Sequence, residues 1–142
     1  MSARTKSRKR ALDILYGADV RQVPIAALLD EEAGRAAAQP ERSSSWPYAR
    51  EIVEGVDAHL ADIDAEIEAH AQGWPLDRMP ALDRALARLA AWEILYNDEV
   101  PDAVAIAEAV ESATVLSTED SAGFLNGLLG GIVRGKELAA GS

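Results

Sequence analysis

Residues 52–67 read IVEGVDAHLADIDAEI, and the spacing of their apolar side chains decides the fold class. Those side chains recur at steps of three or four residues: Ile52, Val56, Leu60, Ile63 and Ile67. This period places apolar residues on one face of a helix and leaves the intervening acidic residues on a solvated face. We therefore predict one continuous amphipathic helix that also carries both histidines of the chain, His59 and His70.

Helical periodicity continues before this stretch. Leu12, Leu15 and Tyr16 begin a first helix, which is expected to stop before Pro24. An Ala-rich helix is predicted from Ile25 to Ala38. Residues 39–47, QPERSSSWP, are rich in breakers and are expected to connect the two halves of one domain.

Three more helices are predicted after the stretch. The first carries a leucine-rich stripe from Leu82 to Leu95, and the second begins at Pro101 or Asp102. The inward face of that second helix is expected to consist of Ala103, Ala107, Val110 and Thr114. The last helix has Phe124, Leu128 and Ile132 on its stripe, with Ser117 or Asp120 as its cap.

The composition agrees with this pattern. The chain has 142 residues, 49% hydrophobic and 5% aromatic, and no alternating strand pattern of useful length. A chain of this size suits a single domain. The sequence therefore predicts an all-α fold of about six or seven helices in one compact domain.

Several classes of protein are excluded. The chain has no cysteine, which rules out disulfides and thiolate metal sites and favours a reducing, cytoplasmic setting. No apolar run reaches the ~18 residues that span a bilayer, so no membrane association is expected. Gly130–Lys136 fits G-x-x-x-x-G-K, but Glu137 replaces the required hydroxyl residue. No catalytic, metal or cofactor site emerges, and we expect a protein that is not an enzyme.

Charge divides the chain unevenly. The net charge is −10, yet residues 1–10 contain five basic residues and no acidic one: Arg4, Lys6, Arg8, Lys9 and Arg10. The other residues hold all 24 acidic side chains and only nine basic ones. This acidic part of the chain repels polyanions, so any RNA contact should be local to the basic segment. We therefore divide the chain into a basic RNA-binding arm, 1–10, and a helical domain, 11–142.

Two features leave alternatives open. Tyr16 lies two turns beyond Lys9 and either stacks on an RNA base or belongs to the core. Four glycines lie on helical spacing in the last helix, Gly123, Gly127, Gly130 and Gly131. Each costs up to ~1 kcal/mol of helix stability relative to Ala, which indicates close packing with another helix or a surface approached by RNA or a partner.

Several ordered motifs resemble the NusB family of bacterial transcription antitermination factors. The basic arm leads into Leu15-Tyr16, and Tyr48, Ile52, Val53, Gly55 and Val56 follow in the middle of the chain. A Trp74–Met79 stretch, an Asp83–Arg88 stretch and a Val100–Val110 run match further on. The last motif, residues 120–129, reads DSAGFLNGLL, where the family pattern is close to DSxxFVNGVL.

The resemblance implies a fold of two packed helical bundles and binding to boxA, a short single-stranded RNA. It implies that the small-subunit ribosomal protein NusE binds together with the chain and that the pair helps RNA polymerase read through terminators. The family's RNA surface combines the basic arm with the start of the last helix. Carried over, the RNA-binding residues are Arg4, Lys6, Arg8, Lys9, Arg10, Tyr16, Asp120, Phe124 and Asn126.

Two alternatives belong to other classes. Some relatives self-associate, so one is a helical homodimer that does not bind RNA. The other is the detached RNA-binding module of an rRNA methyltransferase, which ranks lower because these 142 residues hold no cofactor domain and no cysteine. Within the predicted site, Phe124 stacks on a base or packs in the core, and Asp120 accepts from a base or caps the helix.

Overall fold

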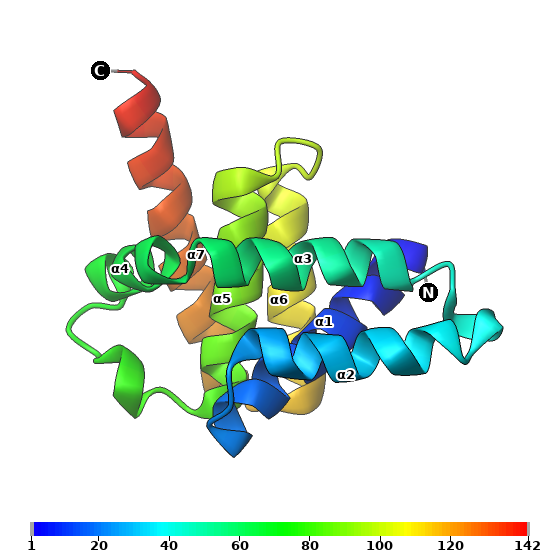
Figure 1. Cartoon of the computed structure of the whole chain (residues 1–142). Coiled ribbons are helices and arrows are strands. Elements are labelled where there is room, and N and C mark those ends of the chain that lie inside the picture. Colours follow the sequence, from blue (N-terminus) through cyan, green and yellow to red (C-terminus); the bar gives the residue numbers. More distant parts are fainter. Residues whose placement is uncertain (1, 142) are drawn as a thin grey trace. The chain divides into compact units, whose positions relative to one another are not determined.

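A computed structural model describes residues 2–141, and seven α-helices contain most of them (Figure 1). No strand occurs in that part of the chain. The helices form two compact units, one reaching to Ala58 and the other beginning at His59. The prediction of an all-α fold with about seven helices in two bundles is confirmed.

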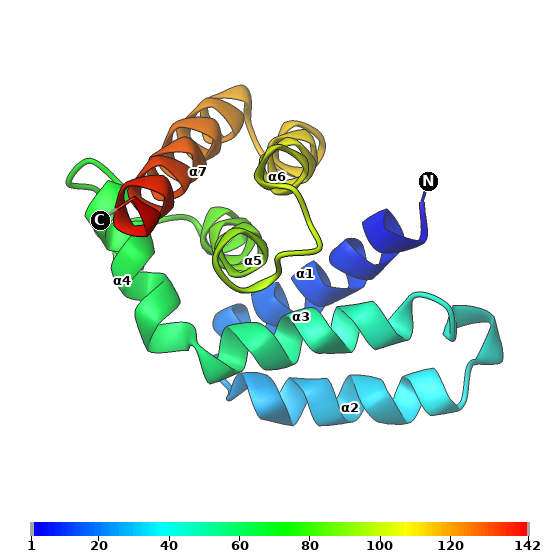
Figure 2. The same ribbon diagram turned by 90° about the horizontal axis from the view of Figure 1, so that it is seen from above.

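The first unit consists of three α-helices and one short 3-10 turn. The helices are α1 (Ala3–Arg21), α2 (Ile25–Ala37) and α3 (Trp46–Ala58), and the turn is η1 (Pro40–Arg42). Each helix packs against the other two, and Figure 2 shows α2 and α3 lying side by side. Residues 39–47 therefore connect α2 with α3 inside this unit, and their predicted position between two halves of the domain is wrong.

Helix α1 begins earlier than its apolar stripe does. The hydroxyl of Ser2 accepts a hydrogen bond of 3.1 Å from the amide of Thr5, which caps the helix. At the other end Gln22 adopts a left-handed conformation (φ 54°), two residues before Pro24. The basic residues of positions 4–10 thus lie within α1, whose helical period determines which of them face solvent.

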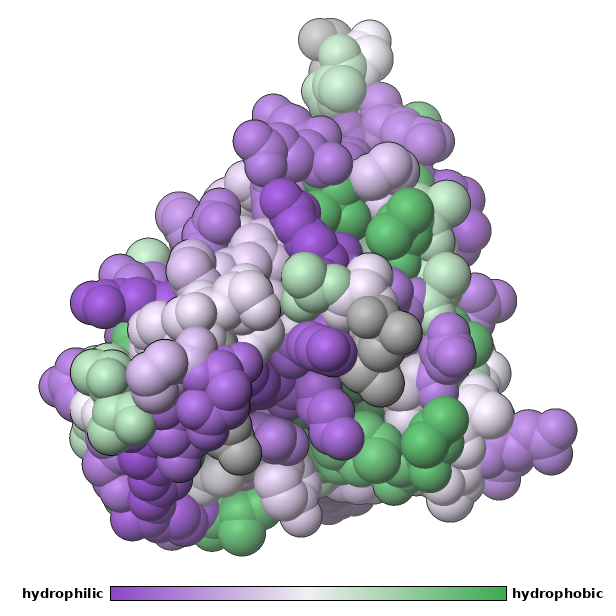
Figure 3. All heavy atoms as spheres, turned by 90° about the vertical axis from the view of Figure 1, so that its right-hand side faces the viewer, coloured by the Kyte–Doolittle hydropathy of each residue, from purple (hydrophilic) through white to green (hydrophobic). Residues whose placement is uncertain are grey.

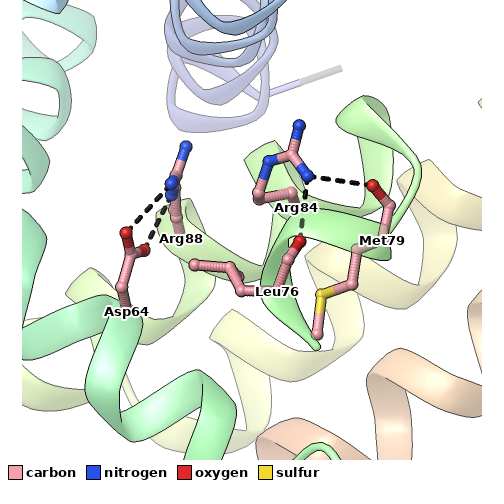
Figure 4. Close-up of polar contacts among 5 residues, drawn as sticks. All are labelled: Asp64, Leu76, Met79, Arg84 and Arg88. Atoms are coloured by element: carbon pink, nitrogen blue, oxygen red, sulfur yellow. Dashed lines mark hydrogen bonds and ion pairs between the residues drawn. The ribbon is translucent and has the colours of Figure 1, made fainter. Parts of the chain in front are cut away.

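The second unit contains α4 (Leu60–His70), α5 (Ala81–Tyr96), α6 (Asp102–Leu116), α7 (Glu119–Ala140) and the 3-10 turn η2 (Leu76–Arg78). Helix α5 packs against each of the other three helices. A bidentate ion pair joins α4 to α5, with Arg88 Nε and Nη2 donating to Asp64 at 2.8 and 3.0 Å (Figure 4). The central position of α5 explains why most of its alanines and leucines are buried.

The predicted continuous helix is wrong, because α3 ends at Ala58 and α4 begins at Leu60. His59 breaks it with φ −118° and ψ 20°, and its ring stacks on Tyr96 of α5 at 3.9 Å between centroids. His59 and His70 are therefore not on one helix. No proline or glycine marks the break. It occurs because the apolar residues on its two sides belong to the cores of different units.

The predicted inward face of α6 is also wrong. Ala105, Ala109 and Ala113 are buried, whereas Ala103, Ala107 and Thr114 are exposed and Val110 is half-buried. This helix carries apolar residues around its whole circumference, so their period does not identify the buried side. Contacts with α5 and α7 decide it instead.

The surface is mixed in character. Figure 3 shows a face on which hydrophilic residues predominate and apolar residues form separate patches. Among residues 2–141, no helix has the length and apolar character needed to span a membrane.

Candidate nucleic-acid interface

The nine predicted RNA-binding residues fall in both units. Six belong to α1 in the first unit, and Asp120, Phe124 and Asn126 belong to α7 in the second. Each group forms a surface of its own and is described separately.

The basic residues of α1 differ in exposure. Arg4, Lys6 and Lys9 are exposed, Arg10 is half-buried, and Arg8 is only 7% exposed. The helical period causes this difference, because position 8 lies on the same side of α1 as the buried residues Ala11, Leu12 and Leu15. Three of the five cations are therefore exposed.

Aromatic residues at the start of α3 contact the arginines. The guanidinium carbons of Arg4 and Arg8 lie 4.1 and 5.9 Å from the centroid of the Tyr48 ring. That of Arg10 lies 5.1 Å from the Trp46 ring, and Arg10 Nη1 donates to Ser45 Oγ at 3.0 Å. These cation–π contacts hold the arginine side chains against the start of α3.

Sequence reasoning did not identify Trp46 and Tyr48 as part of this surface. In the sequence Tyr48 matches a family motif, and Trp46 lies in the predicted connection 39–47. No local pattern indicates them, because Trp46 lies 36 residues beyond Arg10 in the sequence. Only the tendency of arginine to stack on aromatic faces is consistent with the contact.

An exposed stripe runs along α1 at helical spacing through Lys6, Lys9, Asp13 and Tyr16. Tyr16 is 40% exposed, so the alternative that placed it in the core is wrong. Asp13 lies between the lysine and tyrosine positions. Desolvation raises the pKa of its carboxyl, and Glu32 raises it further while Lys9 lowers it. This surface offers two ammonium groups and one aromatic ring to a polyanion.

Thr118 caps α7 in the second unit. Its hydroxyl accepts a 3.0 Å hydrogen bond from the amide of Ser121, so the predicted caps, Ser117 and Asp120, are wrong. Threonine at position 118 has the extended backbone of an N-cap, and Asp120 already lies inside the first turn. Asp120 and Asn126 are exposed, and Phe124 is half-buried.

A buried carboxylate holds the turn between α6 and α7. Asp83 of α5 is 1% exposed and accepts hydrogen bonds from Ser117 Oγ at 3.2 Å and Ser121 Oγ at 2.8 Å. The turn that precedes Asp120 and Phe124 is therefore tied to the central helix of the unit. Asp83 positions this part of the surface without reaching it.

Phe124 has an aromatic neighbour. The ring of Trp74, in the segment between α4 and η2, meets it edge to face with centroids 4.7 Å apart. Trp74 is 37% exposed, so the two rings form a partly exposed aromatic pair. Phe124 thus packs on a neighbour and also presents part of its ring to solvent. The two alternatives for it, core packing and stacking on a base, are therefore compatible.

The glycines of α7 differ in their surroundings, because some pack against His70 and others have no neighbour. A Cβ at Gly131 would lie 3.0 Å from Cδ2 of His70, and one at Gly135 would lie 3.2 Å from its Nε2. Close helix packing explains these two positions. A Cβ at Gly123 or Gly127 would meet nothing within 4 Å, so packing does not require glycine near Phe124.

The remaining charged groups do not form a phosphate-binding loop or a metal site. Gly130–Lys136 lies wholly within α7, and Lys136 Nζ donates to the Ile94 carbonyl and to Asp102 at 2.9 and 2.8 Å. Within residues 2–141, no three His, Asp or Glu side chains gather closely enough to hold a metal ion.

Comparison with known proteins supports the resemblance. The sequence model of the NusB family matches residues 5–134. The transcription antitermination protein NusB of Leifsonia xyli is 63% identical over 136 residues, which cover 96% of this chain and 94% of that protein. T. maritima NusB superposes with a TM-score of 0.79 at 27% identity, covering 94% of this chain and 92% of that one. A NusB chain solved with NusE and double-stranded RNA has a TM-score of 0.81 at 24% identity, covering 95% and 98% of the two chains.

Proposed function

The chain belongs to the NusB family, and we propose that it is a transcription antitermination factor that binds single-stranded boxA RNA together with the ribosomal protein NusE. The relatives carry the name of an antitermination protein, which agrees with the prediction that the chain is not an enzyme. A NusB chain of similar fold has been solved in a complex with NusE and double-stranded RNA.

The single observation that carries the proposal is the stripe of Lys6, Lys9 and Tyr16 on α1. Two exposed ammonium groups at helical spacing can contact successive phosphates, and an exposed aromatic ring two turns on can stack on a base. The rest of the chain is acidic, so this surface is where a polyanion meets least repulsion.

The start of α7 supplies groups that can read unpaired bases. Phe124 presents part of a ring for stacking, and Asn126 and Asp120 present an amide and a carboxylate for the edges of bases. Phosphate contacts position a nucleic acid, whereas stacking and edge contacts distinguish its sequence. We infer that the α1 surface contacts the phosphates and that the start of α7 distinguishes the bases.

The acidic remainder of the chain suits NusE as a basic protein partner. Within this proposal, the complex joins RNA polymerase on nascent transcripts in the cytoplasm. The salt dependence of RNA binding should reflect the exposed cations. With Arg8 buried, three or four phosphates are neutralised, and the slope of log K against log salt should be about −2 to −3.

Light scattering coupled to size-exclusion chromatography tests the proposal. The chain is mixed with NusE, with a single-stranded boxA RNA, with both, and with a scrambled RNA of the same composition. We expect a complex that contains one copy each of the chain, NusE and boxA RNA. Fluorescence anisotropy of the labelled RNA gives the affinity and its salt dependence.

Other outcomes identify the alternatives. A homodimer that binds neither RNA nor NusE would indicate the alternative of an interaction protein without RNA binding. Equal affinity for the boxA and scrambled RNAs would remove sequence recognition from the proposal. Stimulation of rRNA methylation when the chain is added to a methyltransferase catalytic domain would favour the detached module.

A further inference from the structure

We propose that Trp74 is a second base-stacking residue, so that Trp74 and Phe124 together hold one unpaired RNA base on the second unit. The inference rests on the proposed RNA-binding function and extends its site to a segment outside α7. The observation that carries it is the edge-to-face pair of Trp74 and Phe124, with ring centroids 4.7 Å apart and Trp74 37% exposed.

The backbone before Trp74 holds the indole in place. Gln72 and Gly73 both have positive φ, 54° and 82°, and the amide of Trp74 donates to the Ala71 carbonyl at 3.1 Å. A left-handed conformation is unfavourable for a residue with a Cβ, so tertiary contacts must maintain this turn. The turn leaves the indole partly in solvent.

The segment after Trp74 is anchored to α5. Arg84 Nη1 donates to the carbonyls of Leu76 and Met79 at 2.9 and 3.0 Å, as Figure 4 shows. The side chains of Leu76 and Met79 are buried. A partly exposed indole on an anchored segment loses little conformational freedom when it binds a ligand, which is how rigid aromatic anchors contribute to affinity.

The surroundings favour a flat, neutral ligand surface over a phosphate. Asp77 lies three residues after Trp74 and Asp120 four residues before Phe124, and both are exposed, as is Arg78 of η2. The open space at Gly123 and Gly127 leaves room beside Phe124 for a group to approach α7. The face of an RNA base fits such a surface, because stacking needs an aromatic face and not a positive charge.

Substitutions at Trp74 test the proposal, with labelled boxA RNA titrated into the chain in the presence of NusE. Trp74→Leu should weaken binding about five- to a hundredfold, whereas Trp74→Phe retains an aromatic face and should bind within a few fold of the unsubstituted chain. The matched control is Val115→Ala, an exposed apolar residue of α6, which should leave the affinity unchanged.

Two further readouts separate stacking from a structural role. Because stacking releases no counterions, Trp74→Leu should leave the salt slope unchanged, whereas Lys9→Ala should make it shallower. Because Trp46 lies beside Arg10 on the α1 surface, tryptophan emission is followed in the Trp46→Phe background. RNA should quench that emission, and the quenching should be lost when Trp74→Phe is added. The quenching measurement stays informative even if Trp74→Leu proves unstable.

Unchanged affinity in Trp74→Leu, or quenching that persists when Trp74→Phe is added to Trp46→Phe, would overturn the role of Trp74 while leaving the proposed function intact. Failure of the unsubstituted chain to bind boxA RNA with NusE would instead remove the proposed function and this inference with it.

Discussion

The hydroxyl of Ser121 in α7 donates a 2.8 Å hydrogen bond to the carboxylate of Asp83, which is 1% exposed in α5. A buried carboxylate without its donors retains the cost of desolvation. This bond joins the central helix of the second unit to the first turn of α7, which contains Asp120 and precedes Phe124. It links the stability of the unit to the geometry of the proposed RNA surface.

Ser121→Ala should lower the free energy of unfolding by about 2 kcal/mol, because it leaves one oxygen of Asp83 without that donor. For a chain of this size the melting temperature should fall by roughly 5 °C. Ser117→Ala removes a longer bond of 3.2 Å and should cost less. Thermal unfolding followed by circular dichroism measures both, and equal losses would contradict the dominant role of the Ser121 bond.

Arg8 and Lys9 are neighbours with opposite exposure, so they separate stability from binding. Arg8→Ala should destabilise the chain by about 1–2 kcal/mol, because a buried side chain over Tyr48 is lost. Lys9→Ala should leave the melting temperature unchanged and make the salt slope of RNA binding shallower by about 0.7. Denaturant unfolding and anisotropy titrations check the two expectations, and the reverse pattern would assign RNA contact to Arg8.

Asp13 should make stability depend on pH in a definite direction. Its pKa in the folded chain is raised above 3.8, chiefly by desolvation, so folding disfavours the charged form. A raised carboxyl pKa means that stability falls as pH rises through the interval between the unfolded and folded values. Asp13→Asn should therefore be more stable than the unsubstituted chain at neutral pH, and this advantage should disappear when pH falls below 3.8. Melting temperatures across that range test the sign.

Two glycines of α7 should respond oppositely to alanine. Gly131→Ala places a Cβ 3.0 Å from His70 and should destabilise the second unit, because the imidazole must shift. Gly127→Ala meets nothing within 4 Å and should stabilise the helix by up to ~1 kcal/mol. Unfolding curves of the two variants provide the comparison. Destabilisation by Gly127→Ala would show that this position needs glycine for the fold.

Local pattern was sufficient for much of this protein. The three- and four-residue spacing of apolar side chains predicted the helices, because each helix must bury one face. The cluster of Arg4, Lys6, Arg8, Lys9 and Arg10 and the DSAGFLNGLL motif identified both candidate surfaces and the family. These features depend only on residue type and short sequence separations.

Tertiary contacts decided the rest. The break at His59 follows from the division of one apolar stripe between two cores, and the buried side of α6 follows from its neighbours, so neither has a local signal. The arginines of α1 meet Tyr48 and Trp46 from another helix, and Trp74 meets Phe124 across about fifty residues of chain. Periodicity specifies which residues share a face of a helix, but only packing specifies what that face contacts.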